Sequence, residues 1–275
     1  MTLGKIEYAN ASFKNAQIVI MGIPYDRTSS FIPGSRLGPR YIRICTENIE
    51  WFSPYQNRSL DSNRICDLGD YEFTTEDYQK EIEREVFKIY QKKKTAVFLG
   101  GEHTITFPVI KGIKSLVKKF SIIHFDAHAD LRDELHGERV CHATAIRRVA
   151  DIIDLKHIYQ FGIRSGTEEE FKLNKNLYPF EVYRPLKKIL DQIPEPFYLT
   201  IDVDVLDPSQ CPAVATPEPG GISFRELIEA LLLFRVKKII GADIVEFNPL
   251  ATSPWASGST VADILRELIL VMCSK

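Results

Sequence analysis

The sequence predicts an α/β protein in which helices cover both faces of a parallel sheet, that is, a three-layer α/β/α sandwich. The first observation is a series of short apolar runs, rich in β-branched residues and almost continuous in hydrophobicity. Strands that helices bury on both faces have this composition. The second observation is the presence of helical segments between these runs. The runs lie at residues 18–23, 96–99, 121–125, 158–163, 198–203 and 239–245.

The first clear helix and the longest expected loop lie in the amino-terminal third of the chain. Residues 76–94 carry one apolar stripe at helical spacing, and either Thr74 or Thr75 is expected to be the N-cap residue. Residues 24–43 are instead rich in turn-forming residues, with Pro and Gly recurring. We therefore expect a long ordered loop over this segment.

Two further helices are expected near the carboxyl end. Residues 224–235 begin with Ser223 and Glu226, whose spacing is that of a capping box. Residues 260–273 place their apolar side chains on one helical face. Together with the earlier elements, these helices complete the alternation of strands and helices on which the fold prediction rests.

Composition and charge are ordinary for a globular protein. The 275 residues are 44% hydrophobic and 26% charged, and the formal net charge is −2. Both signs of charge are interspersed, so we expect neither a nucleic-acid partner nor a membrane partner. No repeat, low-complexity tract or linker divides the chain. Residues 1–275 are therefore expected to form a single domain.

The cysteines and the amino terminus bear on the compartment. Five cysteines are scattered along the chain without a Cys-x-x-Cys pair, as is typical of thiols in a reducing cytosol. Residues 1–5 lack the apolar core of a signal peptide, and no apolar run approaches the length of a membrane span. We therefore expect a cytoplasmic protein.

Histidine and aspartate gather where three of the predicted strands end. Five of the six histidines fall within 40 residues of one another. His103 closes a Gly-Gly-Glu-His segment after the run at 96–99, and Asp202 and Asp204 lie at the end of the run at 198–203. Sites in open α/β sheets form at the carboxyl ends of strands, where such loops meet. The three segments are therefore expected to share one site.

The segment DAHAD at 126–130 follows the run at 121–125. Extended residues two apart point to the same side of the chain, so Asp126, His128 and Asp130 are expected to converge. The same spacing applies to the two aspartates after the run at 198–203. This alternation is the local reason for expecting the side chains to meet.

The residue types indicate a metal site. Four carboxylates and two imidazoles without a thiolate suit Mn²⁺ or a similar divalent ion better than a soft metal. Six ligands are too many for one ion that must keep a water molecule, but they suit two ions that share bridging carboxylates. Each acid taken alone could equally be a strand-end cap or a turn former. The convergence of three segments favours the metal-site interpretation.

These motifs resemble the arginase–agmatinase–formiminoglutamase family, and its agmatinases most of all. The resemblance rests on GGEH at 100–103, DAHAD at 126–130 and TIDVDVLDP at 200–208, which continues to TPEPGG at 216–221. Similar segments at 22–26, 142–148 and 242–249 extend it over nearly the whole chain. It implies a three-layer α/β/α sandwich around a mostly parallel eight-stranded sheet.

The resemblance also implies two Mn²⁺ ions per chain and a ligand set for each. One ion would be bound by His103, Asp126, Asp130 and Asp202. The other would be bound by Asp126, His128, Asp202 and Asp204. Asp126 and Asp202 would then bridge the two ions. Glu102, which stands where several relatives have Asp, is not among the ligands.

Two further roles follow from the resemblance. Glu246 corresponds to the family carboxylate that pairs with the substrate guanidinium, and a carboxylate can accept two parallel hydrogen bonds from that planar group. His142 begins a His-Ala-Thr segment similar to the one that carries the proton-shuttling histidine. His136 precedes a glycine and superficially matches the His-Gly pair of arginases, but we expect it to line the entrance at most.

The implied reaction is hydrolysis of a guanidino group to urea and an amine, in a homo-oligomer as is usual for the family. The substrate is expected to be agmatine or an N-substituted agmatine, because the loop at 131–135 lacks the neutral polar residues with which arginases hold an amino-acid head group. Asp133 or Glu134 could bind the substrate ammonium, or both could belong to a solvated charged loop. Thr216 is a further candidate for substrate contact, in a loop where Ala215 replaces the Gly of many agmatinases.

Other functions stay open at this point. Guanidinobutyrate, arginine or formiminoglutamate could be the substrate in place of agmatine. A metal-binding scaffold without catalytic activity is an alternative of a different class. The presence of both His142 and Glu246 favours an enzyme over a scaffold.

Overall fold

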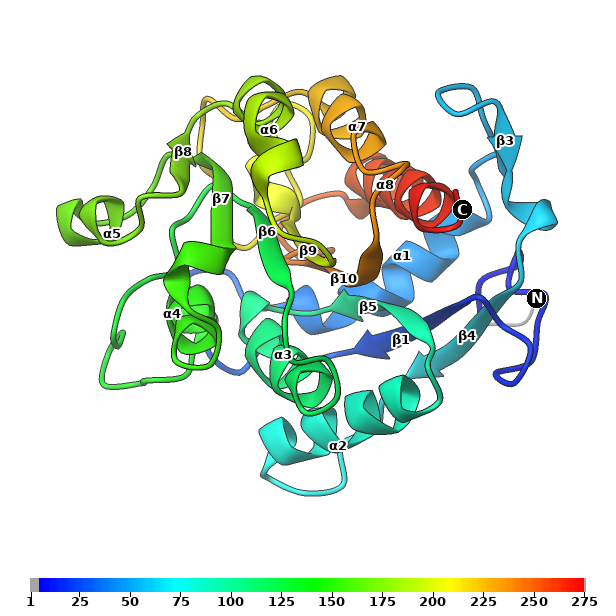
Figure 1. Cartoon of the computed structure of the whole chain (residues 1–275), viewed down its shortest axis with the longest axis horizontal. Coiled ribbons are helices and arrows are strands. Elements are labelled where there is room, and N and C mark those ends of the chain that lie inside the picture. Colours follow the sequence, from blue (N-terminus) through cyan, green and yellow to red (C-terminus); the bar gives the residue numbers. More distant parts are fainter. Residues whose placement is uncertain (1–4, 275) are drawn as a thin grey trace.

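An eight-stranded sheet, parallel at every adjacent pair of strands, forms the middle layer (Figure 1). The computed structural model describes residues 5–274. The strand order is β4-β1-β5-β10-β9-β6-β7-β8. In chain order these strands are β1 (Ile18–Ile23), β4 (Ile65–Asp70), β5 (Thr95–Gly100), β6 (Ser121–Phe125), β7 (Ile158–Ile163), β8 (Leu177–Pro179), β9 (Phe197–Asp202) and β10 (Ile239–Val245). A small antiparallel pair, β2 (Phe52–Ser53) and β3 (Arg58–Ser59), stands apart from this sheet.

Helices cover both faces of the sheet, which confirms the predicted three-layer architecture. One face is covered by α1 (Gly38–Thr46), α6 (Tyr183–Ile189), α7 (Phe224–Leu232) and α8 (Pro254–Met272). The opposite face is covered by α2 (Tyr78–Gln91), α3 (Thr106–Lys114) and α4 (Ala145–Ala150). The short α5 (Glu168–Leu173) lies beside β8 at one end of the sheet (Figure 1).

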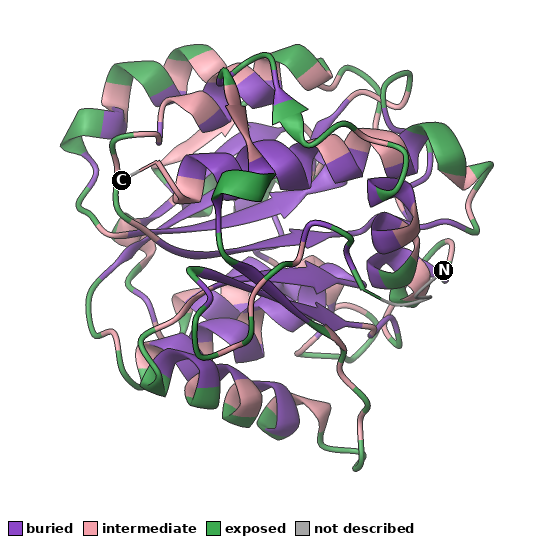
Figure 2. Ribbon diagram, turned by 90° about the vertical axis from the view of Figure 1, so that its right-hand side faces the viewer, coloured by how far each residue is buried: buried purple, intermediate pink, exposed green. Residues whose placement is uncertain are grey.

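The central strands are buried on both faces, which explains their continuous hydrophobicity. In β1, Ile18 and Ile20 belong to the core under α1 and α8, whereas Val19 and Met21 belong to the core under α2 and α3. All six residues of this strand are buried. Figure 2 shows the sheet as a buried layer between helices whose outer surfaces are exposed. A strand with one solvated face would alternate apolar and polar residues instead.

Apart from the small pair β2–β3, two strands were not predicted, and both lie at the edges of the eight-stranded sheet. β4 has three buried residues followed by three that are exposed or half-buried, so its sequence lacks a continuous apolar run. β8 has only three residues and ends at Pro179. Short edge strands with polar residues or proline give little signal in sequence because they are half solvated.

The predicted loop at 24–43 is wrong in its second half. A 3-10 turn at Ser35–Leu37 leads into α1, which begins at Gly38. Pro39 occupies the first turn of this helix, where its missing N–H costs no hydrogen bond. Helix α8 likewise has a proline in its first turn. It begins at Pro254, six residues before the predicted position. The Gly and Pro residues that predicted turns in fact mark helix starts.

The predicted N-cap of α2 is also wrong. The cap is Asp77, whose side chain accepts a hydrogen bond from the backbone N–H of Lys80. The hydroxyl groups of Thr74 and Thr75 instead donate to the carboxylate of Glu81, at 2.9 and 2.7 Å. The threonines therefore stabilise the segment that precedes the helix and do not cap the helix itself.

Only half of the predicted capping box at α7 forms. The Ser223 hydroxyl accepts from the backbone N–H of Glu226 at 3.2 Å, as expected. The Glu226 carboxylate accepts from the backbone N–H groups of Val182 and Tyr183 instead of returning to Ser223. It thereby satisfies free N–H groups at the start of α6.

The described residues contain no helix that is both long and apolar enough to cross a lipid bilayer. Residues 1–4, which form most of the segment expected to lack signal-peptide character, and residue 275 lie outside the described part of the chain.

Candidate metal centre

Four neighbouring strands carry the candidate site at their carboxyl ends. These adjacent strands in the centre of the sheet are β5, β10, β9 and β6. At or just after their last residues lie, in the same order, His103, Glu246, Asp202 and Asp126. A cavity of about 220 Å³ opens over this edge. Its walls include seven of the predicted site residues: His103, His128, Asp130, His142, Asp202, Thr216 and Glu246.

A close backbone approach fixes the loop that carries His103. A Cβ atom at Gly101 would lie 2.0 Å from the carbonyl oxygen of Tyr25, so only glycine fits at this position. The Gly101 N–H donates to the carbonyl oxygen of Ile23, and the Glu102 N–H donates to that of Tyr25. These contacts explain the glycine of the Gly-Gly-Glu-His segment and hold the next residue, His103, at the floor of the cavity.

The predicted residues come together, but not for the predicted reason. β6 ends at Phe125, so the segment after it is not a continuous extended strand. Asp130 adopts a left-handed backbone with φ of 54°. A 3-10 turn at Val203–Val205 contains Asp204. Turns, and not the two-residue alternation of a strand, therefore direct these side chains to a common point.

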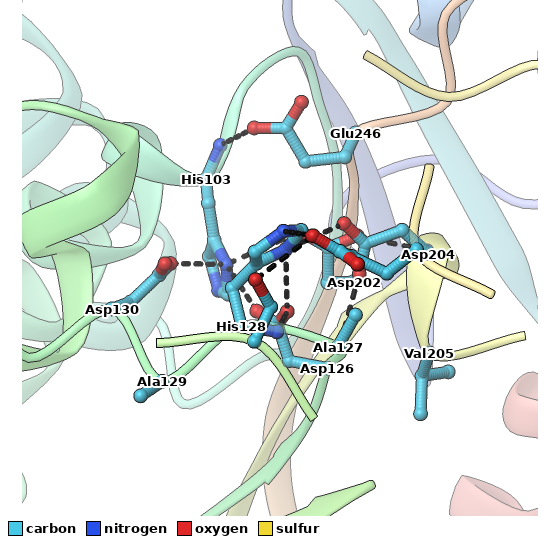
Figure 3. A network of polar contacts seen from close by, with 12 residues as sticks. His103, Asp126, Ala127, His128, Ala129, Asp130, Asp202, Asp204, Val205 and Glu246 are labelled. Carbon is cyan, nitrogen blue, oxygen red and sulfur yellow. Dashed lines mark hydrogen bonds and ion pairs between the residues drawn. The ribbon is translucent and has the colours of Figure 1, made fainter. Parts of the chain in front are cut away.

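The first group of side chains surrounds one imidazole nitrogen. Nδ1 of His103 lies 3.0 Å from Oδ2 of Asp126, 3.0 Å from Oδ2 of Asp130 and 3.4 Å from Oδ2 of Asp202 (Figure 3). The other ring nitrogen of His103 contacts the Thr200 hydroxyl at 2.9 Å. This contact leaves Nδ1 as the nitrogen that faces the carboxylates.

The second group lies next to the first and shares Asp126 with it. Nδ1 of His128 is 2.9 Å from Oδ2 of Asp204 and 3.5 Å from Oδ1 of Asp126. The two oxygens of Asp126 therefore face different groups: Oδ2 faces His103 and Oδ1 faces His128. Ligand atoms of the first group include one from His124 as well, a residue that the sequence interpretation left out.

Two buried atoms show that these groups suit a cation. Within residues 5–274, Nδ1 of His103 and Oδ2 of Asp204 have no hydrogen-bond partner, although both atoms are buried. A buried polar atom without a partner costs free energy. One such atom lies in each group, and each lies about 3 Å from further ligand atoms. A metal ion requires lone pairs that converge and are not already used in hydrogen bonds. The residues of each group therefore fit a metal ion.

The electrostatics of the site also favour cations. Burial, together with the neighbouring carboxylates of Asp204 and Asp126, raises the pKa of Asp202 well above its usual range. Burial disfavours the charged form of His128, but Asp204 and Asp126 outweigh it and raise the pKa of His128 to about 12. Both shifts report an excess of negative charge in a buried space, which a divalent ion would neutralise.

Glu246 lies on the cavity wall directly above His103 (Figure 3). Its backbone is left-handed, with φ of 66°, and its N–H donates to the carbonyl oxygen of Gly101 at 2.8 Å. Burial, followed by the charge of Glu102, raises the pKa of the Glu246 carboxyl well above its usual range. A cationic partner in the cavity would therefore stabilise the charged form of Glu246.

His142 lines the same cavity from the loop before α4, in the 3-10 turn His142–Thr144. Its Nε2 lies 3.0 Å from the Ser30 hydroxyl and its Nδ1 lies 3.4 Å from the Thr28 hydroxyl. Burial lowers the pKa of His142. Glu102 accepts hydrogen bonds from both the N–H and the hydroxyl of Thr28, so this unassigned buried acid anchors the loop that contacts His142.

Asp133 and Glu134, the two candidates for binding the substrate ammonium, are not among the residues that line the cavity. Both are exposed, and the Asp133 carboxylate pairs with Arg147 at 2.9 Å and with Arg148 at 3.3 Å. Their neighbours in the loop line the cavity instead, namely Arg132, Leu135 and His136. The alternative interpretation, a solvated charged loop, describes these two acids better.

Comparison with known proteins agrees with these motifs. The sequence model of the arginase family matches residues 16–271. The agmatinase of Bacillus cereus is 39% identical over 272 residues, covering 95% of this chain and 94% of that protein. The N(1)-aminopropylagmatine ureohydrolase of Thermus thermophilus is 32% identical, covering 87% and 85% respectively. The crystal structure of the agmatine ureohydrolase of Thermoplasma volcanium has a TM-score of 0.90 at 30% identity, covering 100% of this chain and 96% of that chain.

Proposed function

Because this chain belongs to the arginase family, we propose that it hydrolyses the guanidino group of agmatine, or of an N-substituted agmatine, to urea and putrescine or the corresponding polyamine. One observation carries the proposal. Two groups of histidine and aspartate share Asp126 at the floor of a cavity whose walls carry Glu246 and His142. Relatives whose names specify agmatine or aminopropylagmatine support the substrate class.

We propose two Mn²⁺ ions as the cofactors, with Asp126 and Asp202 as bridging ligands. His103 and Asp130 complete the first ligand set, and His128 and Asp204 complete the second. With two divalent cations bound, all four aspartates would be ionised, and their four negative charges would balance the charges of the ions. Oxygen and imidazole ligands without thiolates suit Mn²⁺ or a similar divalent ion better than a soft metal. When bound, such a pair of ions supplies a water molecule that is acidic enough to be a nucleophile near neutral pH.

Glu246 is proposed to bind and orient the substrate. Its Oε1 accepts from the backbone N–H of His103 at 2.7 Å, which fixes the carboxylate plane. The planar guanidinium can then donate parallel hydrogen bonds to this carboxylate. Such contacts hold the guanidinium carbon at a defined place over the metal ligands, and orientation of this kind contributes strongly to rate.

His142 is proposed to move the proton that the reaction requires. Cleavage breaks the bond between the guanidinium carbon and the nitrogen of the amine product, so that nitrogen must gain a proton as it leaves. An imidazole gives and takes protons near neutral pH. The lowered pKa of His142 keeps it neutral in the free protein, ready to take up a proton and then donate it at the leaving nitrogen.

Agmatine is favoured over arginine because of the residues that line the rim. Leu135, His136 and Arg132 are the lining residues that the loop at 131–136 contributes. None is the neutral Asn, Thr or Ser that would hold an α-carboxylate and α-amino group together. Guanidinobutyrate and formiminoglutamate are alternative substrates, and a homo-oligomer is the proposed assembly.

A panel of guanidines tests the proposal. Urea release is measured with Mn²⁺-loaded protein on agmatine, aminopropylagmatine, guanidinobutyrate and arginine at matched concentrations. We expect kcat/KM to be highest for agmatine or aminopropylagmatine. A higher kcat/KM for arginine would reverse the substrate assignment, and the absence of urea from every member of the panel would contradict the proposed reaction.

A further inference from the structure

His124 is a third histidine beside the candidate metal centre. It lies in β6, two residues before Asp126, and is fully buried. One of its ring nitrogens lies close enough to ligand atoms of His103, Asp126 and Asp130 for the four residues to form one possible metal-binding group. From its position alone, His124 could be either a metal ligand or a residue that orients a metal ligand.

A chain of hydrogen bonds runs through His124 from behind the site. Asn174 donates from Nδ2 to Oε1 of Gln160 at 3.0 Å. Nε2 of Gln160 lies 3.0 Å from Nδ1 of His124, and Nε2 of His124 lies 2.7 Å from Oδ2 of Asp126. All four side chains are buried, so every donor in this chain needs an acceptor within the protein.

Backbone groups fix the direction of each hydrogen bond. The Gln160 atom that faces His124 also lies 2.7 Å from the carbonyl oxygen of Ala129, which can only accept, so this atom must be the amide nitrogen. Asn174 is fixed in the same way, because its Nδ2 donates to the carbonyl oxygen of Ile158. Gln160 therefore donates to Nδ1 of His124, and Nδ1 carries no proton.

The tautomer decides between the two roles of His124. With Nδ1 as acceptor, a neutral His124 carries its proton on Nε2, the atom that faces Asp126. A protonated nitrogen has no lone pair for a metal ion, but it can donate a hydrogen bond to a carboxylate. The contact of 2.7 Å between Nε2 and Oδ2 of Asp126 is of the length expected for a hydrogen bond to a charged acceptor.

We infer that His124 is a positioning residue that orients Asp126 for metal binding, and that Gln160 sets its tautomer. This inference rests on the proposed metal centre. His124 occupies one lone pair of Oδ2, and the backbone N–H of His128 occupies one lone pair of Oδ1. Each oxygen of Asp126 keeps its other lone pair, and the two oxygens face the two ligand groups. The carboxylate is thereby held in the orientation that a bridging ligand requires.

Three variants separate a hydrogen-bond donor from a metal ligand. His124→Leu removes the donor. His124→Gln keeps an N–H group at about the distance of Nε2 from the backbone, yet replaces the imidazole. Gln160→Glu replaces the donor to Nδ1 by an acceptor of the same shape, so that Nδ1 of His124 must carry a proton. A neutral ring then turns a lone pair toward Asp126, and the ¹⁵N resonances of the ring in the metal-free protein distinguish this state from a doubly protonated ring. Gln91→Glu, exposed at the end of α2, is the matched control for the added charge.

The measurement is the affinity of the metal-free protein for Mn²⁺, by competition with a chelating dye, together with the electron paramagnetic resonance spectrum of the loaded pair. We expect His124→Leu and Gln160→Glu to bind Mn²⁺ roughly 10- to 100-fold more weakly and to alter the spectrum, as substitutions of residues that orient metal ligands do. His124→Gln should recover most of the affinity, and Gln91→Glu should match the wild type.

Three outcomes would overturn the inference. Wild-type affinity and spectrum in His124→Leu would show that the donor is dispensable. Equal losses in His124→Leu and His124→Gln would indicate a direct ligand. Wild-type behaviour in Gln160→Glu, with His124 neutral by ¹⁵N resonance, would show that Gln160 does not control the tautomer. If His124→Leu does not fold by circular dichroism, His124→Gln and Gln160→Glu decide, since the first should bind Mn²⁺ with most of the wild-type affinity and the second roughly 10- to 100-fold more weakly. Failure of the wild type to bind two Mn²⁺ ions would instead contradict the proposed function.

Discussion

Glu246 and His103 are joined through the backbone: Oε1 of Glu246 accepts a hydrogen bond of 2.7 Å from the N–H of His103. The residue proposed to bind the guanidinium is therefore attached to the residue proposed to bind the first metal ion. The two residues follow the neighbouring strands β10 and β5. This contact sets the position of the carboxylate proposed to bind substrate relative to the proposed metal ligands.

We predict that Glu246→Gln lowers kcat/KM for agmatine by about 10- to 100-fold, because hydrogen bonds to charged groups contribute about 1.5–3 kcal/mol. The amide keeps an oxygen for the His103 N–H, so Mn²⁺ content should stay at the wild-type value. Steady-state kinetics and elemental analysis on the same preparation measure both quantities. Glu134→Gln, an equivalent change at an exposed position outside the cavity, is the control. A variant that loses metal in proportion to activity would contradict the assignment of Glu246 to substrate.

The proposed bridging acids should matter more for metal content than an acid that binds one ion. Asp126→Asn and Asp202→Asn should lose both ions, because each carboxylate belongs to both of the proposed ligand sets. Asp204→Asn should retain about one ion per chain, since only one ligand set contains it. Elemental analysis after dialysis measures the metal content, and Asp154→Asn on the surface controls for the substitution itself. Equal losses in all three variants would count against the bridging assignment.

The two histidines of the loop before α4 should differ in effect. His142→Ala should lower kcat by roughly 100-fold, within the range for general acid–base groups, with normal metal content. His136 lines the cavity but is exposed and adopts a left-handed backbone with φ of 52°, so His136→Ala should act mainly on KM. Kinetics of both variants at equal Mn²⁺ occupancy decide the matter. A large loss of kcat in His136→Ala together with a nearly normal kcat in His142→Ala would reverse the two roles.

Neutralising Asp133 and Glu134 together should leave the KM for agmatine unchanged, because both side chains are exposed and neither lines the cavity. The same double variant should lower the melting temperature slightly, since Asp133 contacts Arg147 and Arg148 at the surface. Steady-state kinetics and a thermal melt of Asp133→Asn/Glu134→Gln test both statements. A large rise in KM would show that the loop closes over the substrate and would restore these acids as candidates for the substrate ammonium.

The sequence predicts the central strands and the convergence of the proposed ligand residues well because their signals are local. Both faces of β1 and β5 are covered, so their apolar runs are unbroken. The edge strands β4 and β8 are half solvated and have no such run. Helix α1 was not predicted because Gly38 and Pro39 are typical of turns. A proline is nevertheless favourable in the first turn of a helix.

The candidate site shows the same division between local and non-local signals. The GGEH and DAHAD segments are contiguous and could be recognised directly. His124 could not be assigned a role from sequence, because its tautomer depends on Gln160 in β7 and Asn174 beyond α5. The position of Asp133 likewise depends on Arg147 and Arg148, which follow it by more than a dozen residues. Contacts between distant segments determine these roles, and no spacing along the chain reveals them.

The most direct test of the central claim is urea release from agmatine by one preparation in three states: as purified, after complete chelation, and after reloading with Mn²⁺. The two ligand groups that share Asp126 predict that metal-free protein releases no urea and that activity returns as two Mn²⁺ ions bind per chain. Metal content is verified by elemental analysis at each stage, and circular dichroism verifies that the metal-free protein is folded. Full urea release by folded, verified metal-free protein would contradict the binuclear metal centre on which the account depends.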